Sequence, residues 1–192
     1  MKKKRLAIIP AREGSKRIKN KNLKKFHKKP LIYYSIKSTL DSGIFDKIHI
    51  SSDSQKILNY SERQGIKTDF VRPKKLSDDL TGLFQVIEYV ADQYKKMGNI
   101  FDEIWLIYAT NPFISKEIIK KCSRQYNKIS NDKSNALITV TKYNYPTQWA
   151  HKIKNKGFLA PLDKKGIKLR SQDLLETYCD AGMINVYSYK KI

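Results

Sequence analysis

The stretch with the clearest chemical potential runs from Ile8 to Asn22 and reads IIPAREGSKRIKNKN. It begins as an apolar run, breaks at Pro10 and continues into a loop with the small pair Gly14-Ser15. The loop carries five cations, at Arg12, Lys16, Arg17, Lys19 and Lys21. Small residues let backbone N–H groups approach an anion, and Arg and Lys neutralise its charge. We therefore predict a phosphate-binding loop here, with a solvated basic loop as the alternative.

Further polar clusters follow other predicted strands. They are Asp53, Arg72 with Ser77-Asp78-Asp79, and Thr110-Asn111-Pro112. Because ligands of open α/β sheets bind at the carboxyl ends of the strands, these clusters and the basic loop predict one crevice for an anionic nucleotide. Asp53 fits equally well as the N-cap of the helix that follows it, and Asp78-Asp79 could cap the next helix.

The elements that must position these clusters alternate along the chain. Apolar runs bounded by charged residues, Pro or Gly predict strands at residues 5–10, 45–52, 68–71, 103–108, 136–141 and 181–189. Apolar spacing and terminal signals predict helices at residues 31–43, 54–65 and 83–97, and another that starts at Ser115. We therefore expect an α/β fold, with an open, mostly parallel twisted sheet, flanking helices and right-handed crossovers.

Residues 142–180 break this alternation, because aromatic residues, Pro and Lys follow one another without a helical period. We expect a single domain over residues 1–192 in which 142–180 form an inserted, partly β excursion, with a hairpin near residues 154–158. Tyr143, Tyr145 and Trp149 are clustered there, and packing or a dimer contact is the favoured interpretation over ligand stacking.

The composition of the 192 residues argues against a membrane protein and a secreted protein. No apolar run reaches the roughly 18 residues of a membrane span, and the first one stops at Pro10, too early for a signal peptide. A cytoplasmic protein is the prediction. Cys122 and Cys179 lie far apart without a CxxC partner, so reduced thiols are expected. The histidines, His27, His49 and His151, show no metal-binding spacing.

The net charge of +21, from 39 Lys and Arg against 18 Asp and Glu, raises the prospect of a polyanionic partner. The excess is spread along the chain, however, and only seven of these residues are Arg. Nucleic-acid binders concentrate Arg and aromatic residues on one face. We favour anionic small-molecule substrates, with a basic nucleic-acid-binding protein as the weaker alternative.

Several motifs in order along the chain resemble the acylneuraminate cytidylyltransferase family, which makes CMP-activated nonulosonic acids. They are IIPAREGSKRIKNKN, KPLIYYSIKSTLDSGIFDKIHISSDSQKI, FVRPKKLSDD, ATNPFI and RSQDL, the last followed by DAG. TNPFI, YNYPTQ and RSQDL are most similar to the pseudaminic acid branch. The sialic acid, legionaminic acid and Kdo enzymes are the near alternatives. The resemblance implies a Rossmann-like nucleotidyltransferase fold.

The resemblance also implies a reaction and a site. An acidic nine-carbon sugar would attack the α-phosphate of CTP and release pyrophosphate, with Mg²⁺ as cofactor, in a homodimer that forms through residues 142–180. The nucleotide would contact Arg12, Gly14, Ser15, Lys16, Lys21, Asn22, Arg72 and Thr81. Arg12 and Lys21 would act in catalysis. The sugar would face Tyr108, Thr110, Asn111, Arg170, Gln172 and Asp173.

Two departures from the family pattern modify this expectation. The family commonly has Ser or Thr where Gly82 and Leu83 stand, so Thr81 is expected to take that place beside the base. The family also carries a D-x-D pair of metal-binding carboxylates beyond the last strand, and this sequence reaches Ile192 without it. We therefore expect no metal ligands and a missing carboxyl-terminal part of the family domain. The alternative function is a catalytically impaired nucleotide-binding remnant.

Overall fold

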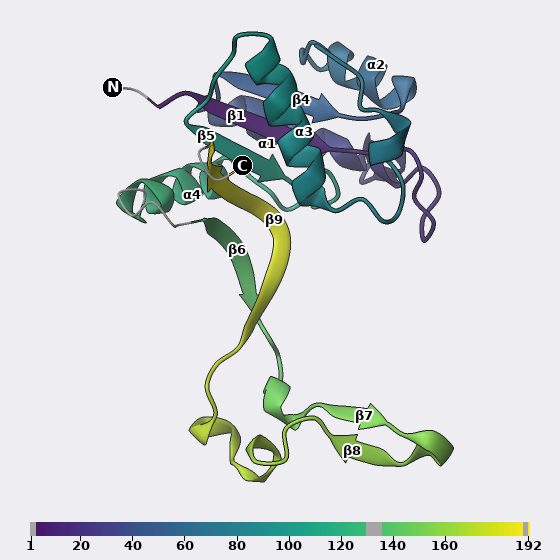
Figure 1. The fold of residues 1–192 in the computed structure, drawn as a ribbon, viewed down its shortest axis with the longest axis vertical. Coiled ribbons are helices and arrows are strands. Elements are labelled where there is room, and N and C mark those ends of the chain that lie inside the picture. The colour runs from purple at the N-terminus through teal and green to yellow at the C-terminus, as the bar shows by residue number, and fades with distance from the viewer. Residues whose placement is uncertain (1–2, 130–135, 190–191) are drawn as a thin grey trace. The chain divides into compact units, whose positions relative to one another are not determined.

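The computed structural model describes residues 3–129, 136–189 and 192 of the chain. Within these residues a five-stranded sheet has the order β4-β1-β5-β9-β6 (Figure 1). Its strands are β1 (Arg5–Pro10), β4 (Lys47–Ser51), β5 (Glu103–Ile107), β6 (Leu137–Lys142) and β9 (Tyr178–Ser188). β1 lies parallel to β4 and to β5, while β9 runs antiparallel to β5. The expected α/β fold with a mostly parallel sheet is confirmed.

The predicted helices also form. They are α1 (Leu31–Ser42), α2 (Gln55–Arg63), α3 (Leu83–Lys96) and α4 (Lys116–Ile129). α1 ends at Ser42 and is capped by Gly43, whose φ of 64° is left-handed, a conformation that glycine adopts without a side-chain clash. At the start of α3 the side chain of Gln85 accepts a hydrogen bond from the Gly82 N–H at 2.8 Å. Among the described residues, none of these helices is both long and apolar enough to cross a membrane.

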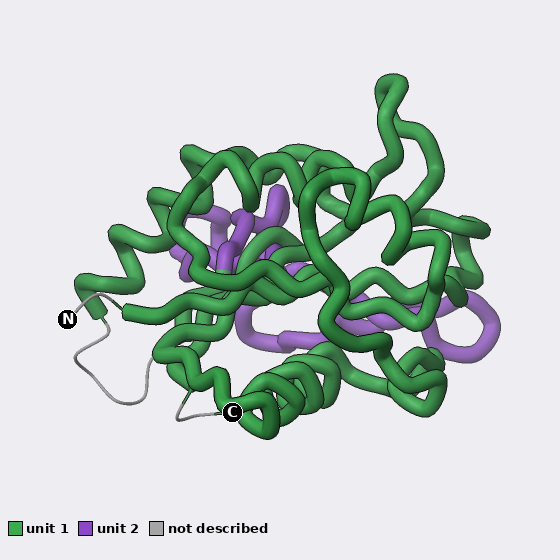
Figure 2. The backbone as a smooth tube through the Cα atoms, turned by 90° about the horizontal axis from the view of Figure 1, so that it is seen from above, with its two compact units in different colours: residues 1–138, 182–192 green, residues 139–181 purple. Residues whose placement is uncertain are grey.

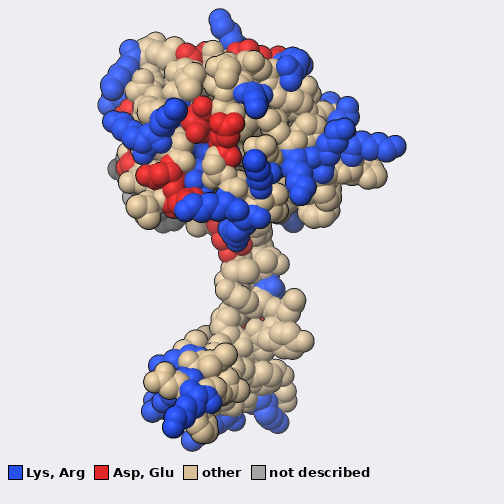
Figure 3. Space-filling view, turned by 90° about the vertical axis from the view of Figure 1, so that its right-hand side faces the viewer, with Lys and Arg blue, Asp and Glu red and all other residues tan. Residues whose placement is uncertain are grey.

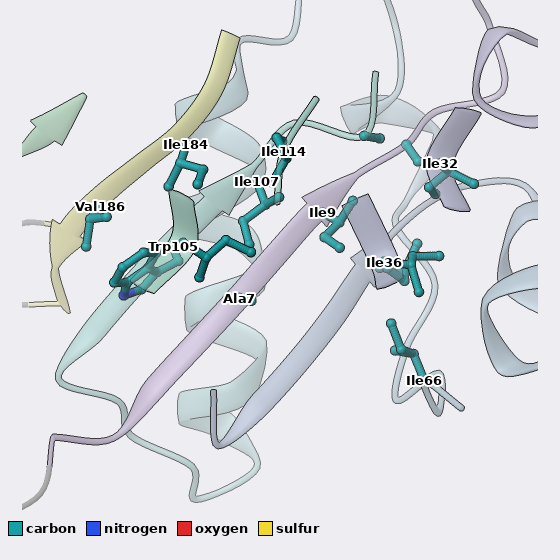
Figure 4. Packing of buried hydrophobic residues seen from close by; sticks show 14 of the residues in the cluster. Ala7, Ile9, Ile32, Ile36, Ile66, Trp105, Ile107, Ile114, Ile184 and Val186 are labelled. Atoms are coloured by element: carbon teal, nitrogen blue, oxygen red, sulfur yellow. The ribbon is translucent and has the colours of Figure 1, made fainter. Parts of the chain in front are cut away.

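The core has two layers because successive residues of β1 face opposite sides of the sheet. Ala7 and Ile9 pack in one cluster with side chains of α1, α2 and α4, and Leu6 and Ile8 pack in the other with side chains of α3. Figure 4 shows the first layer, where the fully buried Trp105 of β5 lies among the aliphatic side chains. α3 thus covers one face of the sheet, and the remaining helices cover the other.

The predicted strand at residues 68–71 is wrong, because this described segment forms no strand and joins no sheet. One backbone bond, from the Arg72 N–H to the Ser52 carbonyl at 2.9 Å, holds its end beside the residues that follow β4. Pro73 comes next and has no N–H, so the pairing cannot continue there. β-branched and aromatic composition over four residues was not enough to make a strand.

The chain divides into two compact units, residues 1–138 with 182–192 and residues 139–181 (Figure 2). The second unit contains an antiparallel hairpin of β7 (His151–Ile153) and β8 (Leu159–Pro161), at the place where a hairpin was predicted. Single turns of 3₁₀ helix occur at Lys21–Leu23, Lys74–Leu76, Thr147–Trp149, Asn155–Gly157, Gly166–Lys168 and Ser171–Asp173. Cys122 and Cys179 are free thiols, as expected.

A small hairpin, β2 (Lys25–Phe26) with β3 (Lys29–Pro30), turns through two residues with positive φ, His27 at 43° and Lys28 at 71°. Such two-residue turns favour glycine, because a Cβ is strained there. Lys28→Gly is therefore expected to raise the free energy of unfolding by about 1 kcal/mol in urea titrations. Lys24→Gly is the control, since Lys24 has an ordinary φ of −64° and should gain nothing. Equal effects of the two substitutions would contradict the turn strain.

Candidate functional site

A cavity of about 200 Å³ lies at the carboxyl ends of β1 and β5 in the first unit. Eight residues predicted for the site line it: Arg12, Ser15, Lys21, Asn22, Arg72, Thr81, Tyr108 and Thr110. The remaining lining residues are Pro10, Leu76, Asp78, Leu83, Val86 and Ala109. Gly14 and Lys16, both described, do not line it. The structure therefore gathers most of the predicted nucleotide-binding side chains into one crevice, as the strand-end argument required.

The basic loop is anchored at its beginning by backbone and short side chains. The Ala11 N–H donates to the Ser51 carbonyl at 2.9 Å, and the Ser52 hydroxyl donates to the Ala11 carbonyl at 2.6 Å. Asn22 is buried, and its amide donates to the Arg12 carbonyl at 2.9 Å, which ties the two ends of the loop together. The loop is thereby fixed to the end of the sheet where the cavity opens.

Asp53 is not the N-cap of α2, contrary to one interpretation of the sequence. Ser54 occupies the N-cap position, and the Asp53 carboxylate accepts a hydrogen bond from the backbone N–H of Glu13 at 3.0 Å. A carboxylate that receives a loop N–H holds the loop as a cap would hold a helix end. Asp53 therefore contributes to the site by positioning the basic loop.

Arg72 is the most unusual residue of the cavity, since only 4% of its surface is exposed. Its Nε and Nη2 atoms have no hydrogen-bond partner among the described residues. Burial lowers the pKa of the Arg72 guanidinium, the nearby Asp53 carboxylate raises it, and the Arg12 cation lowers it further. Burying a cation with two unpartnered nitrogens is costly, and an anion at the cavity would relieve that cost. The position suits a phosphate or another anionic ligand group.

Arg12 and Lys16 share one carboxylate. Arg12 Nη2 and Lys16 Nζ each lie 2.5 Å from an oxygen of Asp79, and Arg12 Nη1 donates to the Ser77 carbonyl at 3.3 Å. The hydrogen bonds from Lys16 and then Arg12 lower the pKa of Asp79, so it stays ionised at neutral pH. The sequence argument treated Asp79 as a possible helix cap and missed this pairing, because it joins residues 67 apart in the chain.

The Asp79 carboxylate competes with any phosphate for the two cations. Asp79→Asn is therefore expected to tighten CTP binding about two- to five-fold, the scale of one exposed ion pair. Isothermal titration calorimetry at low and high salt measures the change, which should shrink with salt. Asp92→Asn, on the exposed surface of α3, removes the same charge and serves as control. Weaker binding by the Asp79 variant would show that the carboxylate supports the site.

The turn before α3 forms one wall of the cavity. The Asp78 carboxylate accepts hydrogen bonds from the Thr81 N–H and hydroxyl, both at 2.7 Å, and these bonds lower the pKa of Asp78. Asp78 thus caps this turn and not the helix itself. Leu83, the first residue of the apolar helical pattern, is 38% exposed and lines the cavity with Val86. The first turn of α3 gives the site an apolar wall that the helical pattern alone could not distinguish from core.

The loop after β5 supplies another wall. The Ser35 hydroxyl of α1 donates to the Tyr108 carbonyl at 2.8 Å, and the Tyr108 N–H donates to the Met183 carbonyl at 3.0 Å. Asn111 donates to the Gly182 carbonyl at 3.2 Å and accepts from the Phe113 N–H at 3.1 Å. Tyr108 and Thr110 line the cavity, while the amide of Asn111 shapes the loop. A sugar contact for Asn111 stays a prediction.

A second cavity, of about 540 Å³, borders the other residues of the basic loop. Its cationic side chains are Arg12, Arg17, Lys19, Lys24 and Lys56. The two cavities share Arg12 and Asn22. Although the second is larger, it lacks the buried Arg72 and the strand-end residue Thr110. We therefore identify the smaller cavity as the candidate nucleotide site.

The remaining sugar-side residues belong to the second unit. Arg170 Nε donates to Asp173 Oδ2 at 2.8 Å in an exposed pair, so each of these side chains already has a charged partner. Gln172 lines a cavity of about 390 Å³ with residues such as Tyr143 and Glu176. Their predicted contacts with a sugar stay predictions.

The described residues contain no group of three or more His, Cys, Asp or Glu side chains that could hold a metal ion. A divalent cation such as Mg²⁺ needs several oxygen ligands, supplied in part by carboxylates. Because Mg²⁺ is commonly held by one or two carboxylates together with substrate phosphates and water, the described residues offer no preformed all-protein site for it, and no chemical step is assigned to the ion.

Comparisons with known proteins give a consistent result. A family model described as cytidylyltransferase matches residues 6–177. The chain is 41% identical to a pseudaminic acid cytidylyltransferase of Campylobacter jejuni, over 93% of this chain and 76% of the relative. It is 28% identical to a CMP-N,N'-diacetyllegionaminic acid synthase of Legionella pneumophila, over 93% of this chain and 72% of that relative. A CMP:2-keto-3-deoxy-manno-octonic acid synthetase structure matches with a TM-score of 0.68 and 15% identity, over 97% and 75%, and so shares the fold.

Proposed function

This chain belongs to the cytidylyltransferase family, and we propose that it transfers CMP from CTP to an acidic nine-carbon sugar and releases pyrophosphate. The proposed acceptor is pseudaminic acid, because the relative at 41% identity is a pseudaminic acid cytidylyltransferase, whereas the legionaminic acid relative is at 28%. The reaction agrees with the strongly basic composition, since the nucleotide and the sugar acid are both anions.

The observation that carries this proposal is the buried guanidinium of Arg72 in a cavity that also holds Arg12 and Lys21. A triphosphate carries several negative charges, and catalysis of its displacement depends mainly on positioning and charge neutralisation. Arg12 and Lys21 come from the loop after β1, whereas Arg72 approaches from the segment after α2. The three cations can therefore contact different phosphate oxygens of one nucleotide.

In the proposed reaction the anomeric hydroxyl of the sugar attacks the α-phosphorus of CTP and loses its proton to water. A bond forms between that oxygen and phosphorus, the bond to the bridging oxygen breaks, and the electron pair leaves with pyrophosphate. Arg12 and Lys21 would stabilise the charge that accumulates on the leaving group. Tyr108 and Thr110 line the cavity where the acceptor would approach.

The test is pyrophosphate release from CTP with pseudaminic, legionaminic, sialic or Kdo acid as acceptor. Release should be fastest with pseudaminic acid, and CTP alone should give only the background rate. A faster rate with another acid would reassign the substrate within the family. Calorimetry with CTP separates this function from that of an inactive nucleotide-binding remnant, which would bind CTP without turnover.

We also propose a homodimer that forms through the second unit. That unit has only 43 residues, yet it exposes many large apolar side chains. Among them are Tyr145, Ile153, Phe158, Leu159 and Leu175, each at least 66% exposed. Exposed apolar surface of this kind marks an interaction site. Light scattering after gel filtration should give about twice the 22.4 kDa mass of one chain. A concentration-independent mass of one chain would contradict the dimer.

Mg²⁺ as cofactor and a cytoplasmic location are part of the same proposal. Turnover with Mg²⁺ or with a chelator tests the ion directly. Nucleic acid is not a proposed partner, because the larger, upper part of the face in Figure 3 carries Asp and Glu side chains among its Lys and Arg side chains. A nucleic-acid binder would instead show affinity for DNA or RNA that falls steeply with salt.

A further inference from the structure

The segment that carries Arg72 into the cavity has little backbone support. Residues 67–73 lie between α2 and the turn at Lys74–Leu76, and none of them belongs to a described helix or strand. The bond from the Arg72 N–H to Ser52 holds one end of the segment. Burial disfavours the charged Arg72 guanidinium, and two of its nitrogens have no described partner, so the side chain would by itself favour solvent. Side chains must therefore hold this segment against the sheet.

Those side chains are Asp69 and Phe70. Asp69 Oδ2 accepts from the Tyr94 hydroxyl at 2.5 Å and lies 2.5 Å from Lys47 Nζ. The Phe70 ring stacks on His49 with centroids 4.3 Å apart and meets Tyr94 edge-on at 5.2 Å. Asp69 and Phe70 lie three and two residues before Arg72. Their contacts therefore join the segment to β4 and to α3 close to the guanidinium.

The chemistry at Tyr94 fixes the direction of the hydrogen bonds. Its hydroxyl has one proton, and that proton is donated to Asp69. His49 Nδ1, 3.2 Å from the same hydroxyl, must then carry the hydrogen and donate to the Tyr94 oxygen. Burial lowers the pKa of His49 to about 4, so the ring is neutral at pH 7. The chain from His49 through Tyr94 ends on an ionised carboxylate, which strengthens each bond in it.

We propose that Tyr94 and Asp69 are positioning residues for nucleotide binding, because they hold residues 67–73 in the place that presents the Arg72 guanidinium to the cavity. The inference rests on the proposed function only in naming CTP as the ligand. Tyr94 is buried on α3 and does not line the candidate nucleotide site, so its effect on the ligand passes through Arg72.

The test compares Tyr94→Phe with Tyr89→Phe. Tyr94→Phe removes the hydroxyl and keeps the ring, whereas Tyr89 also meets Phe70 edge-on but has no described hydroxyl bond to Asp69. Tyr94→Phe should weaken CTP binding about ten-fold and leave kcat within about two-fold, as expected for a lost charge-assisted hydrogen bond that acts on binding alone. Tyr89→Phe should behave as the unmodified chain. Equal binding by both variants would overturn the proposal.

Two further measurements separate positioning from general destabilisation. In an Arg72→Met background, Tyr94→Phe should cause no additional loss of CTP affinity, and a full additional ten-fold loss would contradict action through Arg72. Hydrogen exchange at the Arg72 amide should accelerate in Tyr94→Phe without any nucleotide present. That result would hold even if the chain failed to bind CTP, so failure of the proposed function is distinguishable. Asp69→Leu, which removes the acceptor, should reproduce both effects if Tyr94→Phe folds poorly.

Discussion

Replacing Arg72 with Met is expected to weaken CTP binding by about 100-fold or more, since two hydrogen bonds from a cation to phosphate each contribute about 1.5–3 kcal/mol. The side chain is 4% exposed and offers two guanidinium nitrogens without described partners. Met keeps most of the volume and removes the cost of burying the charge together with its attraction to Asp53, so the free energy of unfolding should change little. Calorimetry with CTP measures the affinity, and urea unfolding measures the stability.

Lys24→Ala is the matched control for Arg72→Met. Lys24 follows the basic loop in the sequence but lines the larger second cavity. CTP affinity should therefore change less than about three-fold, as for one exposed charge. If the two substitutions weakened CTP binding equally, the effect would come from net charge. The basic loop would then be a solvated surface loop and not a phosphate-binding loop.

Trp105→Ala is expected to lower the free energy of unfolding by about 4 kcal/mol, the usual range for deletion of a buried aromatic side chain. Trp105 is fully buried in the middle of the sheet and meets Phe45 edge-on with centroids 5.3 Å apart. Its indole N–H donates to the buried Glu103 carboxylate at 3.1 Å, and that bond would be lost as well. Urea titration followed by circular dichroism measures the change.

Trp149→Ala provides the comparison, because it is the other tryptophan of the chain. Trp149 is half-buried in the second unit and donates to the Leu169 carbonyl at 3.2 Å. Trp149→Ala should lower the free energy of unfolding by about 1–2 kcal/mol, because this half-buried side chain removes less apolar surface from water than Trp105 does. A Trp105→Ala cost below that of Trp149→Ala would contradict the placement of the main core around β5.

Much of the fold was predictable from the sequence because buried parallel strands are continuous apolar runs. EIWLI of β5 is buried at every position, and an apolar run of this length, which starts after Asp102 and ends before the polar residues Thr110-Asn111-Pro112, favours a strand over a helix. The same reasoning gave a wrong strand at residues 68–71, because the position of this segment depends on the tertiary contacts of Asp69 and Phe70. Local composition carries no information about such contacts.

The site was predictable where its residues follow strands in order, as in the basic loop and Tyr108-Ala109-Thr110. It was not predictable where a side chain's role depends on a distant partner. Asp79 pairs with Arg12, and Asp53 holds the Glu13 amide, yet both fitted helix caps equally well in the sequence. The division of the loop's cations between two cavities likewise follows from the path of the backbone.

The most direct test of the central claim is phosphorus NMR of CTP incubated with the chain, pseudaminic acid and Mg²⁺. The proposed displacement at the α-phosphorus predicts a new phosphodiester signal from the CMP-sugar that grows in step with an equal amount of pyrophosphate. Arg72→Met should reduce both signals together. Persistence of the CTP signals with this acid and with legionaminic, sialic and Kdo acids, or formation of CDP in place of pyrophosphate, would contradict the proposed function.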